Sequence, residues 1–285
     1  MYALDKIKRA SDYLAEFDIK DAYREAELIV THCLNINRIV LYKDNPDIPE
    51  SIDNEIEAIL KRRSKREPLQ YILGYTEFYG LKIEVGPGVL IPRPETELLV
   101  EEAVKRILDF RSQNSNIKVL DLCTGSGCIA LAIASVIPEI KVYGIDNSSE
   151  SIKYALKNAK INNIQNVTFF ESNLYESIGK DFKFDLIVSN PPYIKKSDLS
   201  NLQPDIKDWE PLNALDGGNN GLDYYRIIIP DAKDYLKKNG YIILEIGMSQ
   251  AESIRKIAEI AGFTNITLIK DYLGIERIFT LKLNK

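Results

Sequence analysis

The segment Asn190-Pro-Pro-Tyr193 is rich in hydrogen-bond acceptors and poor in donors. Two consecutive prolines stiffen the backbone and remove two N–H groups. The side-chain oxygen of Asn190 and the carbonyl of Pro191 remain as acceptors, and Tyr193 supplies a flat wall. This arrangement suits a planar NH2 group, because each of its two hydrogens can then meet one acceptor.

A planar nitrogen of this kind is a poor nucleophile because its lone pair is delocalised. Fixing both N–H bonds turns the lone pair towards an electrophilic methyl group and stabilises the positive charge that develops on nitrogen. The tetrapeptide needs no histidine or carboxylate base for this task. Its members are therefore the candidate catalytic residues: Asn190, Pro191, Pro192 and Tyr193. The alternative is a proline-rich loop that only ends a strand.

A second motif, Asp121-Leu-Cys-Thr-Gly-Ser-Gly127, is typical of a ligand-binding loop. Its glycines allow a tight turn and a close approach of a ligand to the N-terminus of the next helix. Gly125, Gly127 and Ala130 also fit the dinucleotide fingerprint loosely. Asp146 ends the next strand, where an acid can accept both ribose hydroxyls of an adenosine ligand. Its alternative role is that of a helix cap.

The charge of Asp121 favours one adenosine cofactor over another. This residue ends the strand before the loop, where its carboxylate would repel the pyrophosphate of NAD. S-adenosylmethionine instead carries a sulfonium and an ammonium group there, which a carboxylate attracts. The carboxylate of the same cofactor can face the helix N-terminus. The electrostatics therefore favour S-adenosylmethionine.

The elements that must position these motifs alternate between strand and helix from residue 117 onward. Strands are predicted at 118–122, 141–145, 167–170, 186–189, 241–245, 264–269 and 276–282, and helices at 127–137, 149–160, 223–238 and 249–261. Such alternation predicts a mostly parallel sheet that is covered on both faces. Only residues 270–275 separate the last two strands, so these strands should pair as an antiparallel hairpin.

The front of the chain has a different pattern. Residues 1–66 have the apolar periodicity of helices, and the third helix, around 52–65, ends in the basic run Lys61 to Arg66. That run is either a solvated helix end or a contact for an acidic partner. Residues 75–85 alternate with period two around Gly80, which predicts a hairpin. Pro94 then starts a helix that reaches about residue 110.

Composition excludes several classes of protein. Hydrophobic residues make up 45% and charged residues 28%, which is ordinary for a globular chain with a core. The net charge of −5 weighs against duplex nucleic acid as the main partner, because such binding comes largely from neutralised phosphates. Three cysteines and one histidine form neither a zinc pattern nor a disulfide framework, and they disfavour a Ser-His hydrolase. The longest apolar stretch, 128–137, is half a membrane span, and no secretory signal is readable, so we expect a cytoplasmic protein.

Taken together, Gly125-Ser-Gly127, Asp146 and Asn190-Pro-Pro-Tyr193 resemble the class I S-adenosylmethionine-dependent methyltransferases that act on planar nitrogens. The segment Leu90-Ile-Pro-Arg-Pro-Glu-Thr-Glu97, which follows Glu77-Phe-Tyr79, narrows the resemblance to the release factor glutamine methyltransferases, the PrmC/HemK family. The similarity covers essentially the whole chain. It implies methylation of N5 of the glutamine in the Gly-Gly-Gln motif of peptide chain release factors.

The resemblance also implies an architecture. The fold class is α/β, with a seven-stranded, mostly parallel, Rossmann-like sheet that ends in an antiparallel hairpin. A small helical bundle and a β-hairpin precede it. We therefore expect a substrate-recognition domain at 1–72, a linker at 73–93 and a methyltransferase domain at 94–285. We further expect a monomer whose partner is a release factor, with no membrane and no metal.

Site residues carry over from the family by position. The loop residues Cys123, Thr124, Gly125, Ser126 and Gly127 should meet the methionine part of S-adenosylmethionine, next to Asp121. Asp146 should bind ribose, and the tetrapeptide should hold the glutamine amide, with Asn190 also next to the cofactor. Where the family often has an aspartate and a bulky aromatic residue near adenine, this chain has Asn173 and Leu174. Arg93, Glu95 and Thr96 either line the pocket or start a helix, and Gly217, Gly218 and Gly221 shape the far wall.

Two other functions stay open at the level of sequence. A nucleic-acid methyltransferase that acts on adenine N6 or guanine N2 could use the same tetrapeptide, although the negative charge and the lack of a separate basic domain oppose it. A non-catalytic nucleotide-binding module could use the fold for recognition alone. The intact acceptor tetrapeptide opposes that second alternative.

Overall fold

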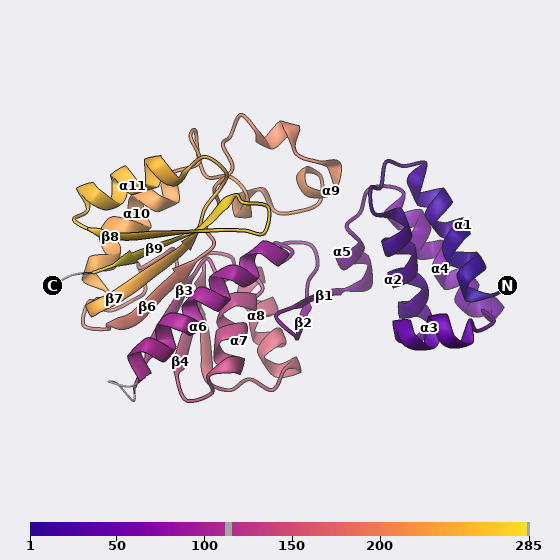
Figure 1. The fold of residues 1–285 in the computed structure, drawn as a ribbon, viewed down its shortest axis with the longest axis horizontal. Helices are drawn as coiled ribbons and strands as arrows, with labels where there is room; N and C mark the ends of the chain where they lie inside the picture. The colour runs from indigo at the N-terminus through magenta and orange to yellow at the C-terminus, as the bar shows by residue number, and fades with distance from the viewer. Residues whose placement is uncertain (112–115, 284–285) are drawn as a thin grey trace. The chain divides into compact units, whose positions relative to one another are not determined.

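The structure is a computed structural model that describes residues 1–111 and 116–283 (Figure 1). The chain forms two compact units. The first contains Met1–Gly74 together with Gln203–Trp209, and the second contains Tyr75–Leu202 together with Glu210–Lys285. The first division falls near the expected start of the linker. No pattern in the sequence predicts that residues 203–209 join the front of the chain.

The first unit is a bundle of helices, as the sequence predicts. Its helices are α1 (Ala3–Ala15), α2 (Ala22–Leu34), α3 (Arg38–Asp44), α4 (Glu50–Arg63), α5 (Leu69–Leu73) and the short α9 (Pro204–Lys207). One apolar stripe from each long helix meets in a common core, with Ile7, Leu14, Ile29 and Ile56 fully buried. This burial explains why short helices are stable here, since packing rather than propensity holds most helices in proteins.

Four charged residues join the two stretches of the first unit. Arg63 ends α4 and is only 4% exposed. Its Nε lies 2.5 Å from Glu25 Oε2 and its Nη2 lies 2.8 Å from Asp205 Oδ2. Arg66 also pairs with Asp205. We call these four residues the Arg63 clasp. The basic run is therefore not uniformly solvated, because part of it is used inside this unit.

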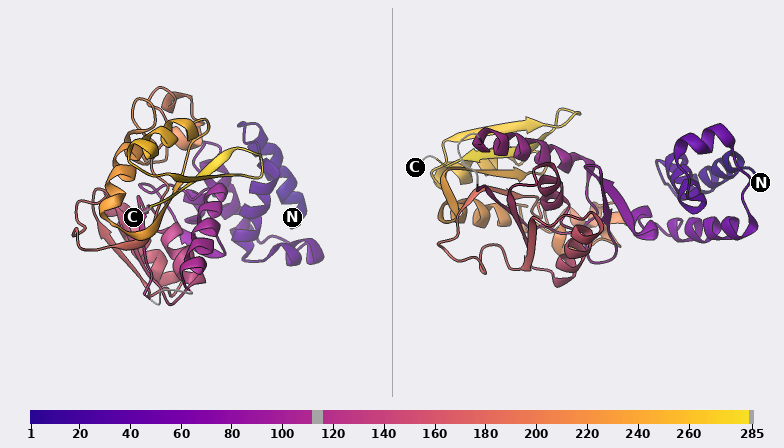
Figure 2. Two further views of the ribbon diagram at one scale, coloured as in Figure 1. Left: turned by 60° about the vertical axis from the view of Figure 1, so that its left-hand side comes forward. Right: turned by 90° about the horizontal axis from the view of Figure 1, so that it is seen from below.

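The second unit contains a seven-stranded sheet in the order β5-β4-β3-β6-β7-β9-β8. Its strands are β3 (Lys118–Leu122), β4 (Lys141–Asp146), β5 (Val167–Glu171), β6 (Phe184–Ser189), β7 (Leu236–Glu245), β8 (Asn265–Lys270) and β9 (Glu276–Lys282). Strands β3 to β7 run parallel, whereas β9 pairs antiparallel with both β7 and β8. Figure 2 shows β8 and β9 at one edge, in yellow. The prediction of a mostly parallel sheet with an antiparallel end is confirmed.

Helices cover both faces of this sheet. Figure 1 shows α6 (Glu97–Arg111), α7 (Cys128–Val136) and α8 (Ser149–Ile161) on one face, with α10 (Asp223–Asp231) and α11 (Ala251–Ile260) on the other. The side chains of Phe184, Tyr225, Phe263 and Phe279 are fully buried in the core that includes α10 and α11. Every residue of β6 is buried, as expected for a central strand with helices on both sides.

The remaining elements are short. Strands β1 (Tyr75–Phe78) and β2 (Leu81–Glu84) form the predicted hairpin, and Asn158 of α8 bonds to the backbone N–H and carbonyl of Glu84. Single turns of 3-10 helix occur at η1 (Pro94–Thr96), η2 (Leu199–Asn201), η3 (Leu212–Ala214) and η4 (Ala232–Asp234). The helix expected from about Glu95 therefore begins as a 3-10 turn and continues as α6.

One predicted element is wrong in length. The helix expected at 223–238 ends at Asp231, and strand β7 already begins at Leu236. Pro230 lies in the last turn of α10, where it has no N–H to bond to the preceding turn. Residues 236–240 instead extend the sheet, because Leu236 pairs with Phe184 before a shift of register. Pairing to a neighbouring strand overrides the local helical pattern here.

We expect the substitution Arg63→Met to lower the free energy of unfolding by about 2–4 kcal/mol, because it leaves Glu25 and Asp205 without their buried cation. Urea titration followed by far-ultraviolet circular dichroism measures this loss. Arg62→Met is the matched control, since Arg62 is 50% exposed and such a pair contributes about 0–1 kcal/mol. Equal losses in the two variants would contradict the clasp as a stabilising contact.

Candidate active site

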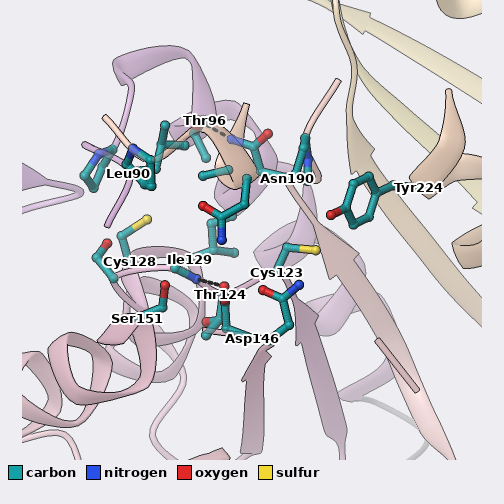
Figure 3. A pocket seen from close by; sticks show the side chains of 18 of the residues that line it. Leu90, Thr96, Cys123, Thr124, Cys128, Ile129, Asp146, Ser151, Asn190 and Tyr224 are labelled. Atoms are coloured by element: carbon teal, nitrogen blue, oxygen red, sulfur yellow. Dashed lines mark hydrogen bonds between the residues drawn. The ribbon is translucent and has the colours of Figure 1, made fainter. Parts of the chain in front are cut away.

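A cavity opens at the carboxyl ends of β3, β4 and β6 (Figure 3). This is the edge of an open α/β sheet where ligands bind. The predicted residues that line it are Arg93, Thr96, Cys123, Thr124, Gly125, Ser126, Asp146, Asn173, Leu174, Asn190 and Pro192. The other predicted residues do not line it: Glu95, Asp121, Gly127, Pro191, Tyr193, Gly217, Gly218 and Gly221.

Gly127 allows the loop after β3 to lie close to the rest of the fold. Its φ is +80°, and an added Cβ would lie 2.9 Å from Phe169 Cζ and 3.0 Å from Ala155 Cβ. No side chain fits at this position. The tight turn lets α7 begin directly at the cavity, where Cys128 and Ile129 of its first turn form part of the wall. The positive end of a helix therefore faces the cavity.

Asp121 lies beneath the loop. It is 0% exposed, and its Oδ2 accepts hydrogen bonds from the Thr124 hydroxyl at 2.6 Å and from the Ala130 N–H at 3.2 Å. Burial raises the pKa of Asp121 to about 7. Direct contact with the cofactor stays a prediction. What the structure describes is an acid that ties the loop to α7.

Asp146 ends β4 at the wall of the cavity. Its Oδ2 accepts from the Gly125 N–H and its Oδ1 from the Ser148 N–H, both at 2.9 Å. Burial raises the pKa of Asp146, and these backbone hydrogen bonds oppose the rise. The N-cap of α8 is Ser148, whose side chain accepts from the Ser151 N–H. The carboxylate is therefore held in place without being used as the cap itself.

The turn after β5 forms the end of the cavity predicted to meet adenine. Ser172 organises it: its N–H donates to the Asp146 carbonyl, and its hydroxyl donates to the Leu174 carbonyl and accepts from the Ser177 N–H. Leu174 adopts a left-handed φ of 46°. Asn173 donates its side-chain N–H to Glu176 at 2.7 Å, which leaves its own oxygen to accept.

Asn190 follows β6 and lies across the cavity from the glycine loop (Figure 3). Its Nδ2 donates to Thr96 Oγ1 at 3.3 Å. Just before it, the Ser189 hydroxyl donates to the Leu122 carbonyl at 2.7 Å, which joins the ends of β6 and β3. The adjacent strand ends therefore place the acceptor turn and the glycine loop around one space.

Contacts from outside the tetrapeptide hold its second half. The Tyr193 carbonyl accepts from Gln250 Nε2 at 2.9 Å, and Gly217 and Gly221 pack against the same residue. A Cβ on Gly217 would lie 2.7 Å from Tyr193 Cα, and one on Gly221 would lie 2.3 Å from the Tyr193 carbonyl oxygen. These glycines support the acceptor turn rather than lining the far wall. Burial raises the pKa of Tyr193 to about 12, so the phenol is neutral.

Sequence reasoning missed about half of the wall. The unpredicted lining residues are Gly88, Leu90, Pro92, Cys128, Ile129, Asn147, Ser151, Ser172, Pro211, Asn213, Ala214 and Tyr224. Glu210 joins two segments of the wall, the one before η1 and the one that begins at Pro211. It is 5% exposed, bonds to the Arg93 side chain and accepts from the Ile91 N–H. Arg93 and Glu210 are separated by 117 positions, so no local pattern could have paired them.

The donor set fits S-adenosylmethionine. Ser126 lines the cavity, and its Oγ is buried without a hydrogen-bond partner among the described residues. The N-terminus of α7 suits the carboxylate of the methionine part, and Asp146 suits ribose hydroxyls. Within residues 1–111 and 116–283, no group of His, Cys, Asp and Glu could hold a metal ion, and no helix has the length and apolarity to cross a membrane.

Comparisons with known proteins place this chain among methyltransferases. Residues 113–261 match the family described as methyltransferase domain, and residues 5–74 match the PrmC N-terminal domain. The release factor glutamine methyltransferase of Thermodesulfovibrio yellowstonii is 47% identical over 100% of this chain and 99% of its own. That of Fusobacterium nucleatum is 41% identical over 98% and 78%. A 16S rRNA N2 G1207 methyltransferase from T. thermophilus, solved with AdoMet and guanosine, is 18% identical with a TM-score of 0.53 over 74% and 50%.

The fold and the cavity define an S-adenosylmethionine-dependent methyltransferase. The cofactor predicted from the sequence is confirmed. The sequence identity to relatives over the whole chain identifies the family within this class. This chain belongs to the family of release factor glutamine methyltransferases.

We expect Asp146→Ala to weaken S-adenosylmethionine binding by one to two orders of magnitude, because hydrogen bonds to a charged group contribute about 1.5–3 kcal/mol. Isothermal titration calorimetry measures the dissociation constant. Glu171→Ala is the matched control, since Glu171 pairs with Asp146 in the sheet, is exposed and does not line the cavity. An unchanged affinity in Asp146→Ala would remove this residue from the binding site.

Proposed function

We propose that this chain transfers the methyl group of S-adenosylmethionine to N5 of the glutamine in the Gly-Gly-Gln motif of peptide chain release factors. The observation that carries the proposal is the fixed amide of Asn190. Its Nδ2 is used by Thr96, so its Oδ1 remains to accept from a substrate. Together with the Pro191 carbonyl it offers two acceptors to one planar NH2 group.

Methyl transfer forms a bond between carbon and the substrate nitrogen. When bound, S-adenosylmethionine supplies an electrophilic methyl on a sulfonium, and the electron pair of the broken bond stays on sulfur. Asn190 Oδ1 and the Pro191 carbonyl accept hydrogen bonds from the two N–H groups of the glutamine amide. This turns the nitrogen lone pair out of conjugation with the amide carbonyl and towards the methyl group. The same acceptors stabilise the positive charge as it grows on nitrogen. One proton then leaves from nitrogen to water.

We also propose roles for the parts of the chain. The loop residues 123–127, with Asp121 beneath them, position the methionine part of the cofactor, Asp146 holds ribose, and Asn173 and Leu174 meet adenine. The tetrapeptide Asn190 to Tyr193 holds the substrate amide. The helical domain at 1–72 recognises the release factor, 73–93 links the domains, and 94–285 carries out the reaction. The net charge of −5 supports a protein rather than a nucleic acid as substrate. We propose that the protein works as a monomer in the cytoplasm.

The decisive assay mixes the protein and methyl-labelled S-adenosylmethionine with either a release factor or total DNA and RNA. We expect label on the release factor, and we expect it to disappear when the Gly-Gly-Gln glutamine is replaced by alanine. Label found only on nucleic acid would overturn the proposed substrate and retain the cofactor. Absence of transfer to any substrate would favour a binding module.

Asn190→Ala should lower kcat by about 10²–10³-fold, the usual cost of removing one group that stabilises developing charge. Binding of S-adenosylmethionine should survive, because the ribose and methionine contacts come from other strands. Single-turnover transfer to a release factor and calorimetry measure the two effects separately. Asn201→Ala, at an exposed position outside the cavity, is the control. Near-normal turnover in Asn190→Ala would exclude its proposed role.

A further inference from the structure

Glu245 is a buried acid beside the site that the proposed mechanism does not use. It ends β7 and is 2% exposed. Strands β6 and β7 are parallel, and Ser189 pairs with Leu244, so Glu245 stands next to Asn190 at the same edge of the sheet. The cavity wall does not include Glu245. Its side chain reaches the cavity wall through another residue.

Thr96 is that residue. Its hydroxyl donates to Glu245 Oε2 at 2.6 Å. Its oxygen accepts from Asn190 Nδ2 at 3.3 Å, and Figure 3 shows these two residues. Thr96 is itself 2% exposed and comes from η1, so residues from three separate parts of the chain meet here. By the relay we mean Asn190, Thr96 and Glu245.

The direction of each hydrogen bond in the relay follows from the charge at its end. An ionised carboxylate only accepts, so the single hydroxyl hydrogen of Thr96 must point to Glu245. Thr96 can then only accept from Asn190. The end of the Asn190 amide that meets Thr96 is therefore nitrogen, and Oδ1 is left as the acceptor.

We propose that Thr96 and Glu245 are positioning residues, which hold the Asn190 amide with Oδ1 towards the substrate only while Glu245 is ionised. This inference rests on the proposed function, in which Asn190 accepts an N–H bond of the substrate glutamine. Neither positioning residue takes a proton from the substrate or touches the transferred methyl group. They select one of the two orientations of the Asn190 amide, which differ by exchange of its oxygen and nitrogen.

Protonation of Glu245 would reverse the order of donors. A neutral carboxyl can donate to Thr96, and the Thr96 hydroxyl can then donate in turn. Asn190 would meet that donor with Oδ1 after a flip of its amide, and Nδ2 would face the substrate. Two donors would then oppose each other, and the site would lose one of its two acceptors. The reaction is therefore expected to require the ionised form.

The surroundings of Glu245 place its protonation in a pH range that an activity assay can reach. Burial raises the pKa of Glu245 to about 7, and the Thr96 hydrogen bond and the charge of Arg277 oppose the rise. The titratable groups that face it come from five parts of the chain: Arg93 and Glu95 at η1, Cys128 on α7, Tyr193 after β6, Tyr225 on α10 and Arg277 on β9. Tyr225 Oη also donates to the Glu245 backbone carbonyl at 2.8 Å. Because the ionised form is the active one, kcat should fall as pH drops through about 7.

The test is the pH profile of kcat at saturating S-adenosylmethionine and release factor, from roughly pH 5.5 to 9. The wild type and Thr96→Ser, which keeps the hydroxyl, should lose activity about tenfold per pH unit on the acid side. Thr96→Val and Glu245→Gln should lower kcat by about 10–100-fold at pH 8 and flatten that limb, because one charge-assisted hydrogen bond is worth about 1.5–3 kcal/mol. KM for the cofactor should change little. Saturation keeps Asp121, whose pKa is also raised, from shaping the profile through cofactor binding.

Thr280→Val is the matched control. Thr280 is a buried threonine of β9 whose Oγ1 has no hydrogen-bond partner among the described residues, so its loss should leave kcat and its pH profile unchanged. Thermal unfolding and cofactor binding show whether each variant is folded.

The outcomes separate the two proposals. If the wild type places no label on the release factor glutamine, the proposed function fails. If it does, and folded Thr96→Val and Glu245→Gln retain wild-type kcat and the acid limb, the positioning role is overturned. Should both variants fail to fold, the wild type still decides: a kcat that stays flat across the whole range contradicts the relay. Loss of activity in Thr96→Ser equal to that in Thr96→Val would also contradict it, because the hydroxyl is then not what matters.

Discussion

The acceptor turn cannot hold itself in place. Pro191 and Pro192 have no N–H, so the backbone hydrogen bonds that usually fix a turn are missing at its centre. Its position depends on distant groups: Thr96 at one end, and Gln250, Gly217 and Gly221 at the other. Residues of the second unit from η1 to the start of α11 thus fix a turn whose side-chain and backbone oxygens accept hydrogen bonds. Methyl transfer needs acceptors without competing donors. Contacts from the surrounding fold therefore hold the turn in place of the missing backbone hydrogen bonds.

Asp121, Asp146 and Glu245 lie near the carboxyl edge of the sheet, and each is engaged in hydrogen bonds within the protein. Asp121 ties the glycine loop to α7, Asp146 is held by two backbone N–H groups, and Glu245 holds Thr96. Asp146 and Glu245 end β4 and β7, Asp121 is the last residue but one of β3, and burial raises the pKa of each acid. In the proposed mechanism their role is to fix the positions of neighbouring groups, not to take a proton from the substrate. This suits a reaction in which nitrogen loses its proton only after it has been methylated.

The sequence predicts the parts of this fold that depend on local patterns. Strand and helix alternation locates the sheet, and the motifs of the glycine loop and the acceptor turn are visible because their residues are contiguous. The helix at 223–238 is overestimated, since pairing of Leu236 with Phe184 depends on a strand far away in sequence. The wall residues Pro211, Asn213 and Ala214 and the relay through Thr96 could not be predicted for the same reason. Thr96 and Glu245 are 149 positions apart, and a threonine in a helix start looks like an ordinary first-turn residue.

The Arg63 clasp ties together two stretches that are far apart in sequence. No single position along the chain therefore separates the first unit from the second. The helical bundle closes around Asp205, a residue that the chain supplies after it has already built four strands of the sheet. A recombination event that exchanged only the residues before Tyr75 between two relatives would bring in a foreign bundle and leave the native α9 behind. The two pieces of one ion-pair network would then come from different parents. We therefore expect the bundle and residues 203–209 to change together in evolution.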